Sequence, residues 1–433
     1  MSPSQPFAID SAYVIKGGTV VDATGSRQAD VLVKKGRIAA VDKALDHKHV
    51  IDAAGCIVAP GLVDLHTHLR EPGREEAETV ESGSRAAALG GYTAVVAMPN
   101  TEPALDNAAA VRQVLDLGAT ALCDVRVAGA ITVGRRGEQL APLGEMAALG
   151  VRLFTDDGNG VQDSRLMRRA LEYAGALGVT LAQHCEDEAL ASGGHMNEGA
   201  WSSRLGVPGI PAEAEELMVL RDIALSRLTG TPVHFLHLST AGSVAMVGAA
   251  KAQGLRVTAE AAPHHFTLTD AECAGYDTVF KVNPPLRGEA DVAAVRAALA
   301  DGTIDAIATD HAPHALEAKE QPFDQAPPGM LGLETALALG LTELGLDHQR
   351  LLALLSWQPA RIAGISGEHG GPIVEGASAN LTVIDPAATW VVEPEHLASR
   401  SRNTPYAGRK LTGKVRHTIL RGEPVVLDAE AQR

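Results

Sequence analysis

The most constraining feature of this sequence is a series of eight short apolar runs that alternate with Ala- and Leu-rich segments of helical period. Strand-like runs separated by helical segments are typical of a parallel sheet that is covered by helices. Eight such units predict an α/β protein with a (β/α)8 barrel of the TIM type, whose catalytic groups gather at the C-terminal ends of the strands. The runs are residues 62–68, 92–99, 124–131, 151–157, 179–184, 232–239, 255–262 and 304–311.

The two ends of the chain have a different pattern. Residues 13–60 consist of short β-like runs broken by Gly and Asp, and the last sixty or so residues resume this pattern. We expect both ends to pair into one small composite β-sandwich domain. The predicted domain limits are 1–60 and 372–433 for the two parts of the β domain and 61–371 for the barrel.

Composition and charge exclude several classes of protein. Hydrophobic residues make up 45% and charged residues 21%, which is typical of a globular protein. There are 37 Lys and Arg against 53 Asp and Glu, and the net charge of -16 disfavours nucleic acid and anionic membranes as partners. The sequence contains neither an export signal nor an apolar stretch of about 18 residues. The four cysteines lie far apart, so we expect no disulfide framework and a cytoplasmic location.

Histidines and aspartates stand at the ends of the predicted strands. His66 and His68 end the first run, and the two-residue repeat of a strand points both imidazoles the same way. An isolated H-x-H pair is more often two unrelated histidines than a metal site. Four further residues favour a metal site, because a barrel brings the ends of their strands together. They are Asp157, His184, His237 and Asp310, at the ends of the fourth, fifth, sixth and eighth runs.

Four imidazoles and two carboxylates are too many ligands for one tetrahedral zinc ion. They suit two cations that share a carboxylate. Such a pair of cations can hold a bridging hydroxide at neutral pH and polarise a carbonyl oxygen. The pattern therefore predicts hydrolysis of an amide or the reverse reaction.

Other candidate residues favour a simpler interpretation. His264 and His265 follow the seventh run, and we interpret them as structural or supporting residues rather than metal ligands. His311 should point away from its neighbour Asp310. Cys185 is most simply a small buried residue.

At eight places the sequence resembles the metal-dependent cyclic amidohydrolases, and among them the bacterial type I dihydroorotases. These places follow the order of the family and cover most of the predicted barrel. They are PGLVDLHTHLREPG (60–73), AMPNTEP (97–103), FTDDG (154–158), QHCED (183–187), HLST (237–240), PHHFTLTD (263–270), KVNPPLR (281–287) and IATDHAPH (307–314).

The resemblance implies a particular assignment of metal ligands. Two zinc ions per subunit are expected, with Asp157 as the bridge and its neighbour Asp156 facing the other side of the strand. Cobalt or manganese would fit the same donors. Many relatives bridge their metals with a carboxylated lysine, but no lysine stands between Lys48 and Lys251. One ion is expected on His66, His68, Asp157 and Asp310, and the other on Asp157, His184 and His237.

Substrate contacts are also implied. Arg70 offers a guanidinium fork for a carboxylate. Asn100 and Asn283, taken alone, are as well explained by turn capping beside proline. Residues 315–330 are polar and Pro-rich, which is typical of a mobile lid or of a plain surface loop. The expected substrate-binding residues are His68, Arg70, Asn100, Asn283, His314 and the backbone near Pro328 and Gly329.

The activity that the resemblance implies is the reversible cyclisation of N-carbamoyl-L-aspartate to (S)-dihydroorotate in pyrimidine biosynthesis. A bridging hydroxide would attack the ring carbonyl, and Asp310 would shuttle the proton. Two alternatives stay open. One is a hydantoinase or allantoinase, and the other is a non-catalytic scaffold for aspartate carbamoyltransferase. A homodimer is the expected oligomeric state, since it is the commonest one for soluble enzymes.

Overall fold

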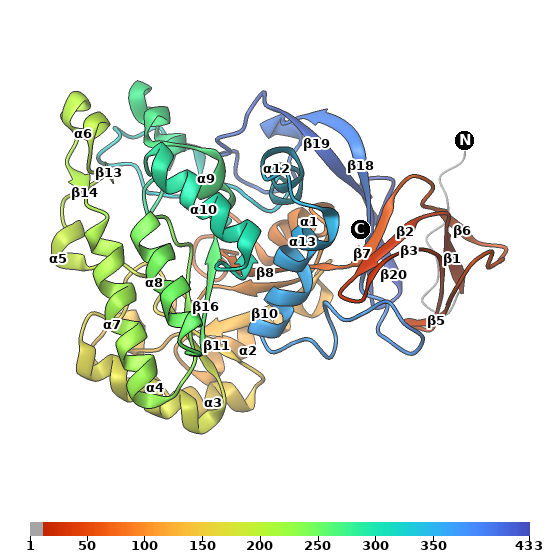
Figure 1. Cartoon of the computed structure of the whole chain (residues 1–433), viewed down its shortest axis with the longest axis horizontal. Coiled ribbons are helices and arrows are strands. Elements are labelled where there is room, and N and C mark those ends of the chain that lie inside the picture. Colours follow the sequence, from red (N-terminus) through yellow and green to blue (C-terminus); the bar gives the residue numbers. More distant parts are fainter. Residues whose placement is uncertain (1–11) are drawn as a thin grey trace.

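The computed structural model describes residues 12–433, and its centre is a parallel barrel (Figure 1). All eight predicted runs form strands, and each strand is hydrogen-bonded to the next one in the chain order of the barrel. An isolated parallel bridge between Thr67 and His311 joins the first and last strands, so the barrel is nearly closed. The predicted (β/α)8 architecture is therefore confirmed. Its strands are β8 Leu62–Thr67, β9 Tyr92–Ala97, β10 Asp124–Gly129, β11 Leu153–Phe154, β12 Thr180–Gln183, β15 Val233–Phe235, β16 Val257–Ala261 and β17 Ala306–Ile307.

Helices cover the outside of this barrel (Figure 1). Their caps agree with the sequence, since Thr79, Asn107 and Asp163 each accept a backbone hydrogen bond at a helix start. The helices around the barrel include α1 Val80–Leu89, α2 Ala108–Leu117, α3 Leu143–Ala148, α4 Ser164–Leu177, α7 Glu213–Thr229, α8 Ala241–Ala252, α10 Glu289–Asp301, α12 Ala336–Glu343 and α13 His348–Leu352. Shorter elements in the connections are α5 Glu188–Ala191, β13 Met196–Asn197, α6 Ala200–Leu205, β14 Gly209–Ile210, α9 Pro263–Thr267, α11 Leu316–Lys319 and α14 Gln358–Ile362.

The apolar core of the barrel has two layers. One lies between the strands and the outer helices and includes Leu62, Phe154 and Phe235. The other is built largely of small residues such as Ala94 and Ala182 and is completed by residues of α14 and the segment after it. Burial on both faces explains why these strands appear as continuous apolar runs in the sequence. Within residues 12–433 no helix combines the length and the hydrophobicity needed to cross a membrane.

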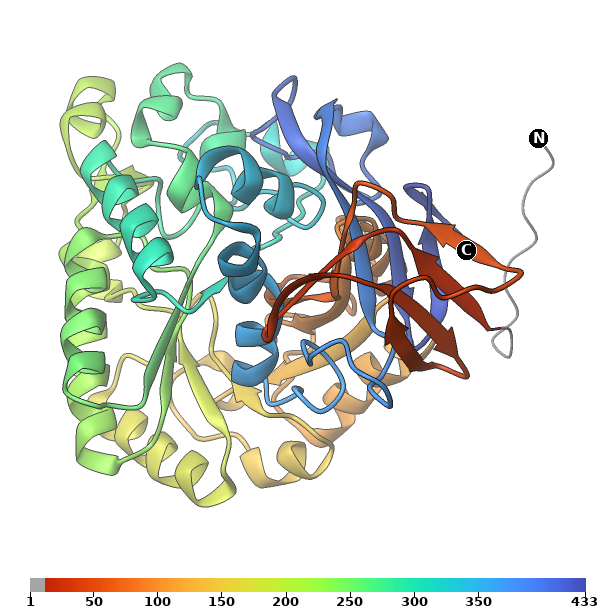
Figure 2. The same ribbon diagram turned by 45° about the vertical axis from the view of Figure 1, so that its right-hand side comes forward.

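The β domain is built from both ends of the chain, as predicted (Figure 2). Antiparallel pairing of β7 with β18 joins the N-terminal and C-terminal parts. An apolar cluster containing Tyr13, Val31, Val58, Val383 and Ile419 lies between the two sheets, which makes the domain a sandwich. One sheet contains β1 Tyr13–Lys16, β4 Asp30–Lys34, β5 Arg37–Asp42 and β6 Val50–Asp52. The other contains β2 Thr19–Asp22, β3 Gly25–Gln28, β7 Ile57–Pro60, β18 Leu381–Val391, β19 Lys410–Leu420, β20 Glu423–Leu427 and β21 Glu430–Ala431.

The connection between the two domains positions the first candidate ligand. β7 ends at Pro60 and β8 begins at Leu62, so the β domain is attached directly to the strand that carries His66. The domain limits themselves stay a prediction, and the expected start at residue 1 lies outside the described residues.

Candidate active site

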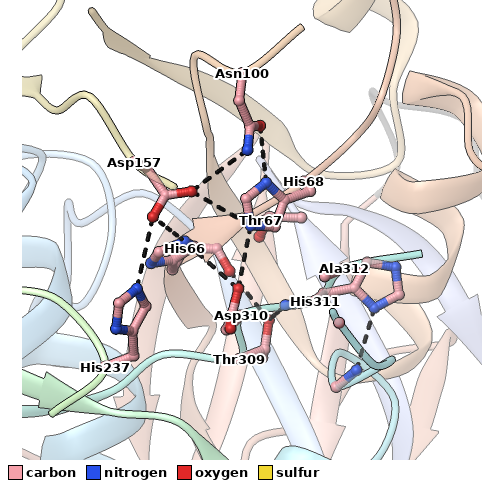
Figure 3. Close-up of polar contacts among 12 residues, drawn as sticks. His66, Thr67, His68, Asn100, Asp157, His237, Thr309, Asp310, His311 and Ala312 are labelled. Carbon is pink, nitrogen blue, oxygen red and sulfur yellow. Dashed lines mark hydrogen bonds and ion pairs between the residues drawn. The ribbon is translucent and has the colours of Figure 1, made fainter. Parts of the chain in front are cut away.

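The six predicted metal ligands converge at the C-terminal end of the barrel. All of them except His184 are labelled in Figure 3. All six are buried, although each has a polar side chain. They come from five strands or the residues just after them, which is where a barrel assembles its catalytic groups. The residues are His66 in β8, His68 after β8, Asp157 after β11, His184 after β12, His237 after β15 and Asp310 after β17.

The first cluster contains His66, His68 and Asp157. Nε2 of His66 lies 3.3 Å from Oδ1 of Asp157, and Nε2 of His68 lies 3.6 Å from Oδ2 of the same carboxylate. Oδ1 of Asp310 lies 3.1 Å from Nε2 of His68 and 3.5 Å from Nε2 of His66. Two imidazole nitrogens and two carboxylates therefore face one small volume.

The second cluster contains Asp157, His184 and His237. Nδ1 of His184 and Nε2 of His237 lie 3.4 and 3.5 Å from Oδ1 of Asp157. These two nitrogens are only 3.1 Å apart. Asp157 belongs to both clusters, so its carboxylate is placed as a bridge between two ligand sets.

The donors fit a pair of metal ions. Among residues 12–433, Nε2 of His66 is buried without a hydrogen-bond partner, and it faces Asp157 and Asp310. Such an atom is costly to bury unless something binds it. Imidazole nitrogen and carboxylate oxygen are common ligands of zinc and similar cations. The two clusters that share Asp157 are consistent with a binuclear metal site.

The local charges keep both carboxylates ionised. Burial acts to raise the pKa of Asp157, but the charge of His66 and the hydrogen bonds from His184 and His237 hold it well below its usual range. The pKa of Asp310 is also lowered, because His66 and its other histidine neighbours outweigh the effect of burial. Ionised carboxylates are the form that binds a cation and accepts a proton.

Three residues at the cavity have a left-handed backbone. The φ angles of Arg70, His237 and Asp310 are 62°, 30° and 46°. Residues other than glycine adopt this region at a cost, and such strain is concentrated at functional sites. The strain here coincides with residues that were selected from the sequence for their chemistry.

Glu260, a fully buried residue of β16, is a functional candidate that was not predicted from the sequence. Its Oε1 lies 3.1 Å from Nδ1 of His66, and its Oε2 lies 3.0 Å from Nε2 of His234. His234 in turn contacts Oγ1 of Thr258 at 2.9 Å. Burial opposes ionisation of Glu260, but His234 and His66 lower its pKa to about 2. The signal in the sequence was a single charged residue inside a buried strand.

Asn100, which is predicted to bind the substrate, also contacts two of the candidate metal ligands. Its Oδ1 lies 2.9 Å from Nδ1 of His68, and its Nδ2 donates to Oδ2 of Asp157 at 3.4 Å (Figure 3). It therefore links His68, which follows β8, to Asp157, which follows β11. This contact leaves Nε2 of His68 directed at the carboxylates.

A cavity of about 210 Å³ opens beside the metal clusters. Arg74, which the sequence analysis did not select, also lines it. All the predicted substrate-binding residues lie in its wall, namely His68, Arg70, Asn100, Asn283, His314, Pro328 and Gly329.

Arg70 and His314 form one side of this cavity. Nε of Arg70 donates to the carbonyl oxygen of Pro313 at 3.0 Å, and Nη2 lies 3.4 Å from Nε2 of His314. Burial lowers the pKa of Arg70 to about 10, so the guanidinium is still charged at neutral pH. Burial and the nearby Arg70 lower the pKa of His314 to about 2, which keeps its ring neutral.

The predicted lid segment, residues 315–330, packs against the rest of the barrel top. Nζ of Lys319 donates to the carbonyl oxygens of Thr278 and Pro327, both at 2.9 Å. Nζ of Lys281 donates to the carbonyl oxygen of Phe323 at 2.7 Å. These contacts position the backbone of residues 327–329 at the cavity.

His265 and His311, which were interpreted as structural residues or as pointing away from the site, make contacts outside the two clusters. His265 contacts the carbonyl oxygen of Pro284 at 3.0 Å, and His311 points away from the cavity to Glu78 at 3.2 Å. His264 lies closer to the site, since its Nε2 is 3.9 Å from Oδ2 of Asp310.

A nearly closed β/α barrel with two His/Asp clusters that share an aspartate defines a metal-dependent amidohydrolase. Residues 55–243 match the family described as Dihydro-orotase-like. The dihydroorotase of Pelotomaculum thermopropionicum is 50% identical over 423 residues, which cover 96% of this chain and 98% of that protein. The dihydroorotase of Streptomyces coelicolor is 49% identical over 429 residues, or 97% and 99% of the two chains. The chain belongs to the dihydroorotase family of the cyclic amidohydrolases.

Solved structures share the whole architecture. The L-hydantoinase (dihydropyrimidinase) of Arthrobacter aurescens superposes with a TM-score of 0.88 at 25% identity, over 97% of each chain. The D-hydantoinase (dihydropyrimidinase) of Thermus sp. gives a TM-score of 0.83 at 25% identity, over 97% of this chain and 96% of that one. The barrel and the composite β domain are thus both shared with these structures.

Proposed function

We propose that this chain interconverts N-carbamoyl-L-aspartate and (S)-dihydroorotate, a step of pyrimidine biosynthesis. One observation carries the proposal. In a chain of the dihydroorotase family, a single cavity is lined by Asp310, by the shared Asp157 and by the charged Arg70. This arrangement suits a small substrate that has both an amide bond to break or form and a carboxylate to hold.

The proposed metals are two zinc ions. His66, His68, Asp157 and Asp310 would hold one ion, and Asp157, His184 and His237 the other. When bound, the pair of cations supplies an activated water and draws electron density from the amide carbonyl. The protein positions these groups with buried side chains, which exclude bulk water from one side of the reaction.

Asp310 is the proposed proton shuttle. It is ionised, lines the cavity, and has one oxygen 3.1 Å from Nε2 of His68. In the hydrolytic direction it would accept a proton from the attacking water and pass it to the departing ring nitrogen. In the cyclisation direction it would take the proton from that nitrogen and give it to the departing hydroxide, which leaves as water.

Arg70 is proposed to bind the substrate carboxylate. Its Nε donates to the carbonyl oxygen of Pro313, which orients the guanidinium, and Nη1 has no protein partner among residues 12–433. Asn100, Asn283, the neutral His314 and the backbone at Pro328 and Gly329 would supply uncharged contacts around the ring.

The test is hydrolysis of dihydroorotate by the purified chain, followed by ultraviolet absorbance on protein of measured zinc content. Turnover that is lost with a chelator and restored by zinc is the expected result. Hydantoin and allantoin are assayed beside it, and a higher kcat/KM on either would overturn the choice of substrate. If fully metallated protein turned over none of the three substrates, dihydroorotate, hydantoin and allantoin, a non-catalytic role would be favoured.

The cell compartment and the protein partners belong to the same proposal. All four cysteines are buried free thiols, which fits the cytoplasm. Aspartate carbamoyltransferase is the partner whose product this chain would consume. Co-sedimentation of the two purified proteins tests that contact. If each protein in the mixture sedimented as it does alone, the contact would be rejected.

A further inference from the structure

The cavity beside the metal clusters contains a second arginine that has no role in the proposed reaction. Arg74 lines this cavity together with Arg70. The two residues belong to one turn, because the backbone N–H of Arg74 donates to the carbonyl oxygen of Arg70 at 3.1 Å. Arg70 is buried, whereas Arg74 is exposed. Arg74 is therefore the solvent-facing one of the two arginines.

The protein does not neutralise the positive charge of Arg74. Within residues 12–433 its guanidinium forms neither an ion pair nor a hydrogen bond. The exposed Arg85, in contrast, is paired with Glu81. Glu75, which follows Arg74 in the chain, accepts a hydrogen bond from the backbone N–H of Gly73 at 2.8 Å instead. The guanidinium of Arg74 is thus available to a ligand.

A third arginine adds to this positive region. Nη1 of Arg135 donates to the carbonyl oxygen of Asp157 at 2.5 Å, and its Nε is buried without a partner among the described residues. A Cβ atom on Gly158, a residue of the cavity wall, would lie 3.8 Å from the same Nη1. Burial lowers the pKa of both Arg70 and Arg135, and the positive charge of Arg74 adds to the lowering. The three guanidinium groups therefore influence one another at this cavity.

The negative charges of the cavity already have partners in the proposed reaction. Asp157 and Asp310 are proposed metal ligands, so the cations would take up their charge. The arginines remain as an excess of positive charge on a chain whose net charge of -16 otherwise repels anions. A positive opening of this kind attracts anionic ligands, and it attracts a dianion more strongly than a monoanion.

We propose that Arg74 is a specificity-determining residue that favours the ring-opened substrate over the closed ring. The proposal rests on the function proposed above, in which the two ligands of the site differ in charge. Dihydroorotate has one carboxylate, which Arg70 would hold, whereas N-carbamoyl-L-aspartate has two. The free charge of Arg74 holds the dianion in the cavity more strongly than the monoanion.

Steady-state kinetics of Arg74→Gln in both directions test the proposal on zinc-loaded, full-length protein. KM for N-carbamoyl-L-aspartate should rise by about three- to fivefold, and KM for dihydroorotate by less than about twofold, as expected for the loss of an exposed charge interaction. The equilibrium constant of the reaction is fixed, so kcat/KM must change by the same factor in both directions. The ratio of the kcat of cyclisation to the kcat of hydrolysis should therefore rise with the ratio of the two KM values.

Two variants and the ionic strength separate this role from a structural one. Arg74→Lys keeps a positive charge and should have KM values within about twofold of wild type, because the effect depends on charge and not on the guanidinium fork. Arg112→Gln removes another exposed arginine, on α2 and outside the cavity wall, and should change neither KM. The difference between wild type and Arg74→Gln should shrink as the ionic strength rises from about 0.02 M to about 0.5 M.

The outcomes distinguish this proposal from the function on which it rests. If wild type is active and Arg74→Gln changes both KM values equally, or changes neither, the role of Arg74 is overturned and the proposed function stands. If zinc-loaded wild type turns over neither compound, both proposals are overturned.

Discussion

Nδ1 of His66 lies 3.1 Å from Oε1 of Glu260, and the other oxygen of that carboxylate lies 3.0 Å from His234. The contact fixes which nitrogen of His66 carries the hydrogen and directs Nε2 at Asp157 and Asp310. Partners of this kind commonly hold metal-binding histidines in place and raise their basicity. Glu260 is therefore placed to control the metal site without touching the metals.

Replacing Glu260 by glutamine should lower metal affinity by about 10- to 100-fold, because an amide is a weaker acceptor for the His66 ring. The similar shape of glutamine keeps the packing. Competition with a chelator measures the affinity. The matched control is Glu78→Gln, which changes a buried carboxylate paired with His311 away from the clusters. Equal losses in both variants would contradict a specific role for Glu260.

Asp310→Asn should keep most of the metal and lose nearly all turnover. A carboxamide can still lie beside His68 and His66, but it cannot shuttle a proton, and loss of a general acid or base costs about 10²- to 10⁴-fold in rate. Metal content and kcat are measured on the same preparation. Complete loss of metal, or turnover near that of wild type, would reject the assignment.

The fold was predictable because strand and helix periods are local properties of the sequence. All eight apolar runs became barrel strands, and the Gly-rich ends became the composite sandwich. The six candidate ligands were predictable because each stands at a strand end, which the barrel brings together. Five of them meet in two clusters around Asp157, and Asp310 lies beside His66 and His68.

Other parts of the site depend on tertiary contacts that no local pattern contains. Glu260 in β16 and His66 in β8 are 194 positions apart in the sequence. Their contact therefore depends on the tertiary fold and is not visible in any local pattern. The hydrogen bond from Nζ of Lys319 to the carbonyl oxygen of Thr278 likewise joins two segments that are 41 positions apart.

Arg70→Met should raise KM for dihydroorotate by about 10- to 100-fold with a smaller effect on kcat, since charged hydrogen bonds of this kind contribute about 1.5–3 kcal/mol. Arg70→Lys keeps the positive charge but loses the guanidinium fork, so its KM should lie between those of wild type and Arg70→Met. Arg85→Met, at an exposed residue of α1 paired with Glu81, serves as the control. An unchanged KM would show that another group binds the carboxylate.

Glu334 should make stability depend on pH. Burial raises the pKa of this carboxyl from 4.5 to about 7, although the backbone N–H groups of Ala398 and Ser399 act against the shift. Between these two values the folded state binds more protons than the unfolded state, so the free energy of unfolding falls as pH rises.

Glu334→Gln removes this titration and keeps an oxygen for the two N–H groups. The Tm of the variant relative to wild type should therefore be higher at about pH 8 than at about pH 5. Glu343→Gln breaks ion pairs with Arg296 and Arg409 instead and should not be stabilising at the higher pH. If the Tm difference between Glu334→Gln and wild type were the same at both pH values, Glu334 would not be the titrating group.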